Sequence, residues 1–414
     1  MLDAPMLPSF LARLRDLGSA PRRAHPEPRG PRLVVGWGLT VVGVHGLLRL
    51  VLPAAETPNG SPTEARGNAE RRHALADPAQ SATARPVPHA GDPTAASPDV
   101  PPHERTRSGM PTLQPGSSLL ALLPDTQFYS YRHAEVFIDQ TRWLATHASA
   151  LDIRFVVHLG DIVHRNSLPE WRRAALALSR LEGAVPFAVV PGNHDYGPFG
   201  NARTRETGLN AVLSFARHAG RPSFGGAFES GRLDNSYHLV EASGHAFIVL
   251  ALEWGPRNQV IDWANDVMQR HPDRRGILVT HAYLYRDGRR YDHTHPEWNQ
   301  ANNPHQYGTE GGVNDGEQLW QKLVRHHDFV MTVNGHVTGT GTGYLVSTTD
   351  TGTRCHQMLS NYQMRDRGGE GYLRLLELDA DGSTVTVHTY SPWLNRQIVE
   401  PNQQFQFTIE PPAN

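Results

Sequence analysis

The chain of 414 residues contains a single cysteine, Cys355, and this scarcity limits its chemistry. One cysteine excludes an intrachain disulfide and a zinc site built from cysteine thiolates. An excess of basic charge is also lacking, because 39 Lys and Arg residues face 41 Asp and Glu residues, for a formal net charge of −2. Electrostatic capture of nucleic acid is therefore not expected.

Long hydrophobic runs are scarce, and the one that stands out lies near the N-terminus. Residues 1–32 form a basic tail rich in arginine, and residues 33–48 then carry no charged side chain. We interpret residues 33–55 as a signal peptide or a signal anchor, with its arginine-rich side in the cytoplasm. This predicts an exported protein that is either secreted or anchored on the outer side of the cytoplasmic membrane. Only this N-terminal segment is expected to touch the membrane.

The next segment, residues 56–116, lacks apolar periodicity and is rich in Pro, Ala, Gly, Ser and Thr. Such a composition cannot bury enough apolar surface to offset the entropy lost on ordering. We therefore predict a disordered linker over 56–116 and a folded domain over 117–414.

Within this domain, short apolar segments are each followed by a polar side chain. The first three alternate with segments of helical periodicity, which predicts parallel strands joined by right-handed crossovers. Parallel strands of this kind end at the same edge of a sheet. The predicted strands are 118–124, 155–159 and 187–190, and the side chains after them are Asp125, Asp161 and Asn193.

Two later strands end in the same way, at His281 and at His336. Between them lies a polar loop, residues 286–316, whose histidines His293, His295 and His305 either wall a pocket or belong to a solvated loop. The segments beyond residue 340 alternate in the manner of antiparallel strands, so the domain needs two packed sheets.

The side chains at these five strand ends offer oxygen and nitrogen donors and no sulfur, which favours a hard or borderline divalent metal. Two further polar residues, His194 and Asp195, follow Asn193 directly. We predict that Asp195 orients His194 as a general acid.

These motifs resemble the calcineurin-like metallophosphoesterases, a family that includes purple acid phosphatases and cyclic nucleotide phosphodiesterases. The resemblance implies an α/β fold in which two packed mixed β-sheets are flanked by helices, as a four-layer sandwich. The motifs that carry it are Asp125-Thr126-Gln127, Gly160-Asp161, Gly192-Asn193-His194-Asp195, His281 and Gly335-His336-Val337-Thr338.

The resemblance also implies two divalent metal ions, from among Mn, Fe, Zn and Mg. Asp161 would bridge them, one ion would also bind the three ligands Asn193, His281 and His336, and Asp125 would bind the other.

Two positions depart from the family pattern, and both concern the ion at Asp125. Gln127 and Thr338 stand where the family carries histidines, and both remain candidate ligands. His164 lies three residues after Asp161, where purple acid phosphatases carry a tyrosine ligand. It is either a ligand or a hydrogen-bonding residue of the pocket.

The predicted function is hydrolysis of a phosphate mono- or diester of a small phosphorylated substrate. Metal ions about 3.5–4 Å apart would generate a hydroxide that attacks phosphorus. Two alternatives remain at this point: hydrolysis of a phosphoanhydride such as a nucleotide or lipid pyrophosphate, and a catalytically weak metal-binding surface module.

Overall fold

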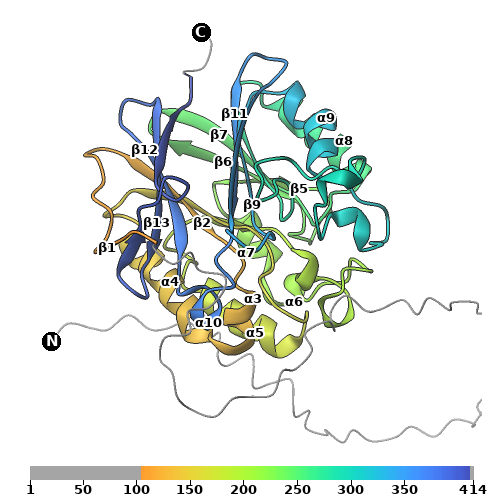
Figure 1. Ribbon diagram of the computed structural model, residues 1–414, viewed down its shortest axis with the longest axis horizontal. Coiled ribbons are helices and arrows are strands. Elements are labelled where there is room, and N and C mark those ends of the chain that lie inside the picture. The colour runs from red at the N-terminus through yellow and green to blue at the C-terminus, as the bar shows by residue number, and fades with distance from the viewer. Residues whose placement is uncertain (1–103, 411–414) are drawn as a thin grey trace, which may run out of the picture. The chain divides into compact units, whose positions relative to one another are not determined.

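The computed structural model describes residues 104–410, which form two β-sheets packed face to face with helices on both outer sides (Figure 1). The basic tail, the apolar segment and residues 56–103 of the linker lie outside the described residues. Among residues 104–410, no helix has the length and apolar character needed to cross a membrane.

The start of the folded domain was predicted too late in the chain. Strand β1 (Thr106–Ser108) pairs antiparallel with β14 (Arg396–Ile398), so residues 104–116 belong to the domain and not to the linker. All three residues of β1 are exposed, so this edge strand lacks the apolar pattern by which a strand is recognised from sequence.

The first sheet contains eight strands in the order β1-β14-β13-β12-β2-β3-β4, with β15 paired to β13. Strands β2, β3 and β4, at one end of this order, are parallel, as the sequence predicts, and the others pair antiparallel. The remaining bounds in this sheet are β2 Ser118–Leu123, β3 Ile153–His158, β4 Phe187–Val189, β12 Leu373–Leu378, β13 Thr384–Ser391 and β15 Phe405–Thr408.

The second sheet contains seven strands in the order β10-β11-β9-β8-β7-β6-β5. Its parallel strands are β7, β8, β9 and β11. The bounds are β5 Phe224–Ala227, β6 Ser236–Ala242, β7 His245–Ala251, β8 Arg275–Val279, β9 Phe329–Asn334, β10 Thr342–Thr348 and β11 Arg354–Ser360.

Alternation along β2 shows how the layers are built. Leu119, Ala121 and Leu123 belong to the core beneath the helices, whereas Leu120 and Leu122 belong to the core between the two sheets. This period of two buries both faces of the strand and confirms the four-layer sandwich. The helices are α3 Gln127–Arg132, α4 Ala134–His147, α5 Leu168–Leu178, α6 Leu209–Val212, α7 Phe215–Ala219, α8 Asn258–Arg270, α9 Gly316–Lys322 and α10 Asp366–Gly369.

Helices α4 and α5 pack on the outer face of the first sheet, and α8 and α9 pack on the outer face of the second. The predicted ligands follow the carboxyl ends of parallel strands in both sheets.

Candidate metal centre

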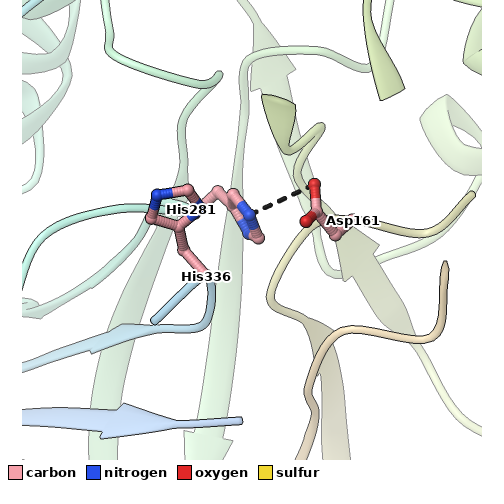
Figure 2. Close-up of side chains that lie close together, drawn as sticks. All are labelled: Asp161, His281 and His336. Atoms are coloured by element: carbon pink, nitrogen blue, oxygen red, sulfur yellow. Dashed lines mark ion pairs between the residues drawn. The ribbon is translucent and has the colours of Figure 1, made fainter. Parts of the chain in front are cut away.

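Three of the predicted ligands come together from three different strand ends. Asp161 follows β3, His281 follows β8 and His336 follows β9, and one ligand atom of each lies within 4.8 Å of the others (Figure 2). Asp161 Oδ1 lies 3.2 Å from His281 Nε2, and Asp125 Oδ1 lies 4.0 Å from the same nitrogen. The four side chains are buried. The two sheets therefore contribute carboxylates and imidazoles, respectively, to one cluster.

Two buried atoms in this cluster have no hydrogen-bond partner, although one of them faces the carboxylate of Asp161. The side-chain oxygen of Asn193 and the Nε2 atom of His281 are buried and make no hydrogen bond. His281 Nδ1 lies 2.7 Å from the carbonyl of Leu159, so the neutral ring carries its proton on Nδ1 and a lone pair on Nε2. Buried acceptors without partners are costly, and a divalent cation would satisfy both. The residues present thus fit a metal ion.

His336 is held in a similar way by a backbone carbonyl. Its Nε2 lies 2.9 Å from the carbonyl oxygen of Asn302, which leaves Nδ1 as the nitrogen with a lone pair. Its backbone N–H donates to Asp125 Oδ1 at 3.0 Å. A carbonyl from the polar loop 286–316 therefore fixes the tautomer of a ligand, and the ligand in turn orients Asp125.

The motif glycines are needed because the backbone passes directly over the carboxylates. A Cβ atom on Gly192 would lie 2.3 Å from Asp161 Oδ1, and one on Gly335 would lie 2.2 Å from Asp125 Oδ2. Two ligands also carry positive φ angles, 49° for Asp161 and 74° for His336. Strained backbone of this kind is found where a site requires its geometry.

Burial and mutual charge shift the titration of the cluster. Burial, reinforced by the charge of Asp161, raises the pKa of Asp125 to about 8. Burial alone would lower the pKa of His281, but the carboxylate of Asp161 outweighs it and raises that pKa to about 9. Burial lowers the pKa of His336 to about 3. In the absence of a cation, the cluster therefore retains a proton that metal binding must displace.

The predicted contact between Asp195 and His194 is wrong. The carboxylate of Asp195 accepts hydrogen bonds from the backbone N–H groups of Gly192 at 2.8 Å, Ile162 at 3.0 Å and Val163 at 2.8 Å. Residues 193–195 form a 3₁₀ turn, in which neighbouring side chains point about 120° apart. Asp195 is therefore a positioning residue that holds the loop carrying Asp161.

His194 is oriented instead by the loop after β3. Its Nδ1 lies 2.8 Å from the carbonyl oxygen of His164, and its backbone N–H donates to Asp161 Oδ1 at 3.0 Å. The ring of His194 is partly exposed. Nε2, the other nitrogen of the His194 ring, therefore points away from the His164 carbonyl that holds the ring.

The remaining candidate ligands do not join the cluster. Gln127 donates to Gln363 and its Oε1 lies 3.3 Å from His164 Nδ1. His164 stacks on His194 with 5.0 Å between ring centroids, which fits the hydrogen-bonding alternative better than the ligand alternative. Thr338 is half-buried, and its hydroxyl makes no hydrogen bond within residues 104–410. In this arrangement, Asp125 and Asp161 are the ligands that a second ion would find.

The histidines of loop 286–316 form contacts within the loop itself. His293 Nδ1 lies 2.9 Å from Asp315 Oδ2, and the His293 and His305 rings stack 3.7 Å apart. Asp315 also caps α9, and His295 pairs with Glu297 at the surface. This loop contributes the carbonyl of Asn302 to the centre, together with the rings of Tyr291 and Tyr307, which lie 6.0 Å and 6.4 Å from the ring of His336.

Trp254 was missed from the sequence, although it follows the predicted strand over 245–252. Its buried ring lies 5.8 Å from that of His281 and 5.0 Å from that of His336. The preceding residue, Glu253, is buried and accepts hydrogen bonds from Asn235 at 3.0 Å and Arg257 at 2.8 Å. The sequence signal that could have identified Trp254 is a carboxylate and an aromatic residue at the end of a sixth strand.

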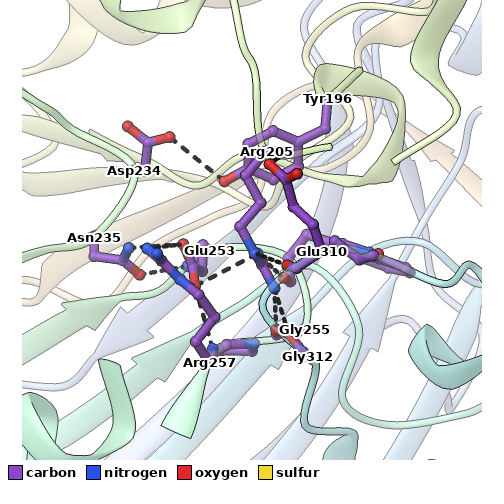
Figure 3. A network of polar contacts seen from close by, with 12 residues as sticks. Tyr196, Arg205, Asp234, Asn235, Glu253, Gly255, Arg257, Glu310 and Gly312 are labelled. Carbon is purple, nitrogen blue, oxygen red and sulfur yellow. Dashed lines mark hydrogen bonds and ion pairs between the residues drawn. The ribbon is translucent and has the colours of Figure 1, made fainter. Parts of the chain in front are cut away.

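Arg205 ties this strand end to two loops (Figure 3). Its guanidinium donates to the carbonyls of Trp254 at 2.8 Å, Gly255 at 2.9 Å and Gly312 at 2.8 Å. It also lies 3.4 Å from Glu253 Oε1, and its side chain is 9% exposed. One buried cation thus fixes the backbone from which Trp254 packs against the two histidine ligands.

Replacing Arg205 with methionine is expected to lower the free energy of unfolding by about 2–4 kcal/mol, because four carbonyls, including that of Glu310, lose their donor and Glu253 loses one of its two arginines. Thermal and denaturant unfolding measure this. The control is Arg154→Met, which removes a surface ion pair with Asp152 and should change stability by less than about 1 kcal/mol. Equal stability of the two variants would show that the Arg205 network contributes little.

A four-layer sandwich that gathers carboxylate, amide and imidazole side chains at the carboxyl ends of strands from both sheets is suited to binding a divalent metal ion. The model of the calcineurin-like phosphoesterases matches residues 120–339, more than half of the chain, and the chain belongs to this family.

A relative from Bacillus subtilis, the uncharacterized protein YvnB, is 31% identical over 285 residues, which cover 66% of this chain and 20% of the relative. The chain thus spans about a fifth of that protein's length. A dimetal phosphatase from Danio rerio is 13% identical with a TM-score of 0.43, covering 71% of this chain and 99% of that one. A purple acid phosphatase from yellow lupin is 12% identical with a TM-score of 0.42, covering 72% and 54%.

Proposed function

We propose that the chain is a metal-dependent phosphoesterase that hydrolyses a mono- or diester of a small phosphorylated substrate. The observation that carries the proposal is a pair of buried atoms without a hydrogen bond, Asn193 Oδ1 and His281 Nε2, beside Asp161 in the region that the family model matches. A cation bound beside Asp161 would give both acceptors the partner that the described residues do not supply.

Asp161, Asn193, His281 and His336 would hold one divalent ion, Mn, Fe, Zn or Mg. A second ion would rest on Asp125 and Asp161 with weaker oxygen donors. A bound divalent cation supplies Lewis acidity, which lowers the pKa of water and offsets charge on the phosphoryl oxygens.

The chain's own residues orient the reaction and move a proton. The attacking water gives up a proton to the solvent as its oxygen forms a bond to phosphorus, the ester P–O bond breaks, and the departing alkoxide takes up a proton. His194 is placed to supply that proton from Nε2, because its Nδ1 is held by the carbonyl of His164. Asp195 holds the loop that carries Asp161, which keeps the spacing between the Asp161 carboxylate and the His194 imidazole.

We also propose that this reaction takes place outside the cytoplasmic membrane. The support is the arginine-rich N-terminal tail followed by the uncharged run 33–48 and the linker. The catalytic domain would then reach phosphorylated substrates at or beyond the outer surface of the cytoplasmic membrane.

The test uses the full chain, stripped of metal and reloaded with Mn²⁺, Fe²⁺, Zn²⁺ or Mg²⁺, on matched aryl phosphate monoester and diester substrates. We expect at least one metal to restore turnover, and the preferred substrate defines the ester class. Bound metal without turnover on these esters or on a pyrophosphate substrate would favour a metal-binding module and contradict the proposal.

A further inference from the structure

An open pocket of about 400 Å³, within the range of small-molecule sites, is lined by His164 and Gln363, which contact His194 and Gln127 of the family motifs. We call it the α3 pocket, because three of its lining residues belong to helix α3. Its main lining residues are Phe128, Tyr131, Arg132, His164, Arg165 and Met364.

The α3 pocket borders the machinery of the proposed reaction. His164 lines it and stacks on His194 with an interplanar angle of 21°. Gln363 also lines it and is hydrogen-bonded to Gln127 of the first motif. A substrate whose phosphoryl group lies at Asp161 can therefore extend its leaving group past His194 into this pocket.

The mouth of the α3 pocket carries two cations without a carboxylate partner. The guanidinium carbons of Arg132 and Arg165 lie 4.6 Å and 5.0 Å from the ring centroid of Tyr131. Within residues 104–410, neither guanidinium forms an ion pair; the nearby Glu170 accepts from the backbone N–H of Arg165 at 2.8 Å. A hydrogen bond from Arg132 and both positive charges lower the pKa of Tyr131. Like charges held together favour an anionic ligand.

The wall of the same pocket presents flat and apolar surfaces. The Phe128 and Tyr131 rings lie 5.2 Å and 5.3 Å from the ring of His164. Met364 stands at the rim and is 48% exposed. Aromatic faces beside a polarisable thioether suit the stacking of a planar ring.

We infer that the α3 pocket binds a leaving group that combines a planar ring with a phosphate other than the one hydrolysed. A nucleoside bisphosphate is a substrate of this kind, because its hydrolysis releases a nucleoside monophosphate as the leaving group. The inference rests on the proposed function for its assignment to a leaving group. The ring lies against Phe128 and Tyr131, and the second phosphate lies between Arg132 and Arg165.

The experiment compares ligands that differ by one phosphate, adenosine 3′,5′-bisphosphate and adenosine 5′-monophosphate. Dissociation constants are measured by calorimetry on the full chain, before and after metal loading, and kcat/KM is measured on the loaded chain. The dinucleotide ApA and its 5′-phosphorylated form pApA serve as the matched diester pair. We expect the additional phosphate to improve binding and kcat/KM by at least about tenfold.

The double variant Arg132→Ala/Arg165→Ala should bring this ratio close to one. Arg142→Ala is the control, because Arg142 is an exposed arginine of α4 that pairs with Asp139. The ratio compares two ligands on one preparation, so a partly unfolded variant does not mimic the effect. A ratio near one in the wild type, or a ratio that survives the double variant, overturns the inference. Binding with the expected ratio but without turnover contradicts the proposed function and supports the anion pocket.

Discussion

Asp161→Asn is expected to lower kcat/KM for the preferred phosphate ester by at least about 10³-fold, because a lost cation removes several kcal/mol of transition-state stabilisation. The side chain of Asp161 faces His281 Nε2 at 3.2 Å and accepts the backbone N–H of His194 at 3.0 Å. Asparagine keeps the size of the side chain and tolerates the positive φ angle of this position. The fold should therefore survive while the charge that holds the metal is lost.

Three measurements check this expectation: kcat/KM, bound metal and the thermal unfolding midpoint. The control is Asp139→Asn, which neutralises a carboxylate on α4 away from the centre and should leave all three values near those of the wild type. Turnover within tenfold of the wild type in Asp161→Asn would contradict the assignment of Asp161.

His194→Gln is expected to lower kcat by about 10²–10⁴-fold while the metal content stays the same. The imidazole is anchored through Nδ1 and lies beside the cluster, but it is not one of the three residues whose ligand atoms are grouped there. Its loss should therefore affect the proton delivered to the leaving group, and the effect should be smaller for leaving groups of low pKa.

The dependence on leaving-group pKa separates a lost proton donor from a general loss of structure. His147→Gln is a matched control, because Nδ1 of His147 lies 2.8 Å from a backbone carbonyl, that of Trp143, outside the site. If His194→Gln slowed all leaving groups equally, or released the metal, His194 would act as a ligand or support and not as the acid.

The strand ends that form the centre could be predicted because each is an apolar run that is followed by a polar residue. Burial dictates the apolar run, and a parallel arrangement of strands brings the ends to one edge. Asp161, His281 and His336 were located in this way, and the structure groups them. The two-sheet sandwich followed from the same pattern.

The contacts around these ligands could not be predicted, since they depend on local geometry and on distant segments. Asp195 follows His194 directly, yet the 3₁₀ turn directs its carboxylate to the backbone of residues 162 and 163. Asn302 acts through its carbonyl, a group that every residue possesses and that carries no sequence signal. Strand β1 is a short, exposed edge strand. It buries no apolar face, so it leaves no apolar pattern in the sequence.

The most direct test of the account is the metal content of the full chain after reconstitution and extensive dialysis, measured by elemental analysis for the wild type and His281→Gln. His327→Gln is the control, because His327 is a half-buried histidine that bonds Asn265 outside the centre. We expect at least one divalent ion per chain in the wild type and the control, and its loss in His281→Gln. A wild type that retains no ion, or a His281→Gln variant that retains as much as the wild type, would contradict the assignment of this cluster as the metal centre.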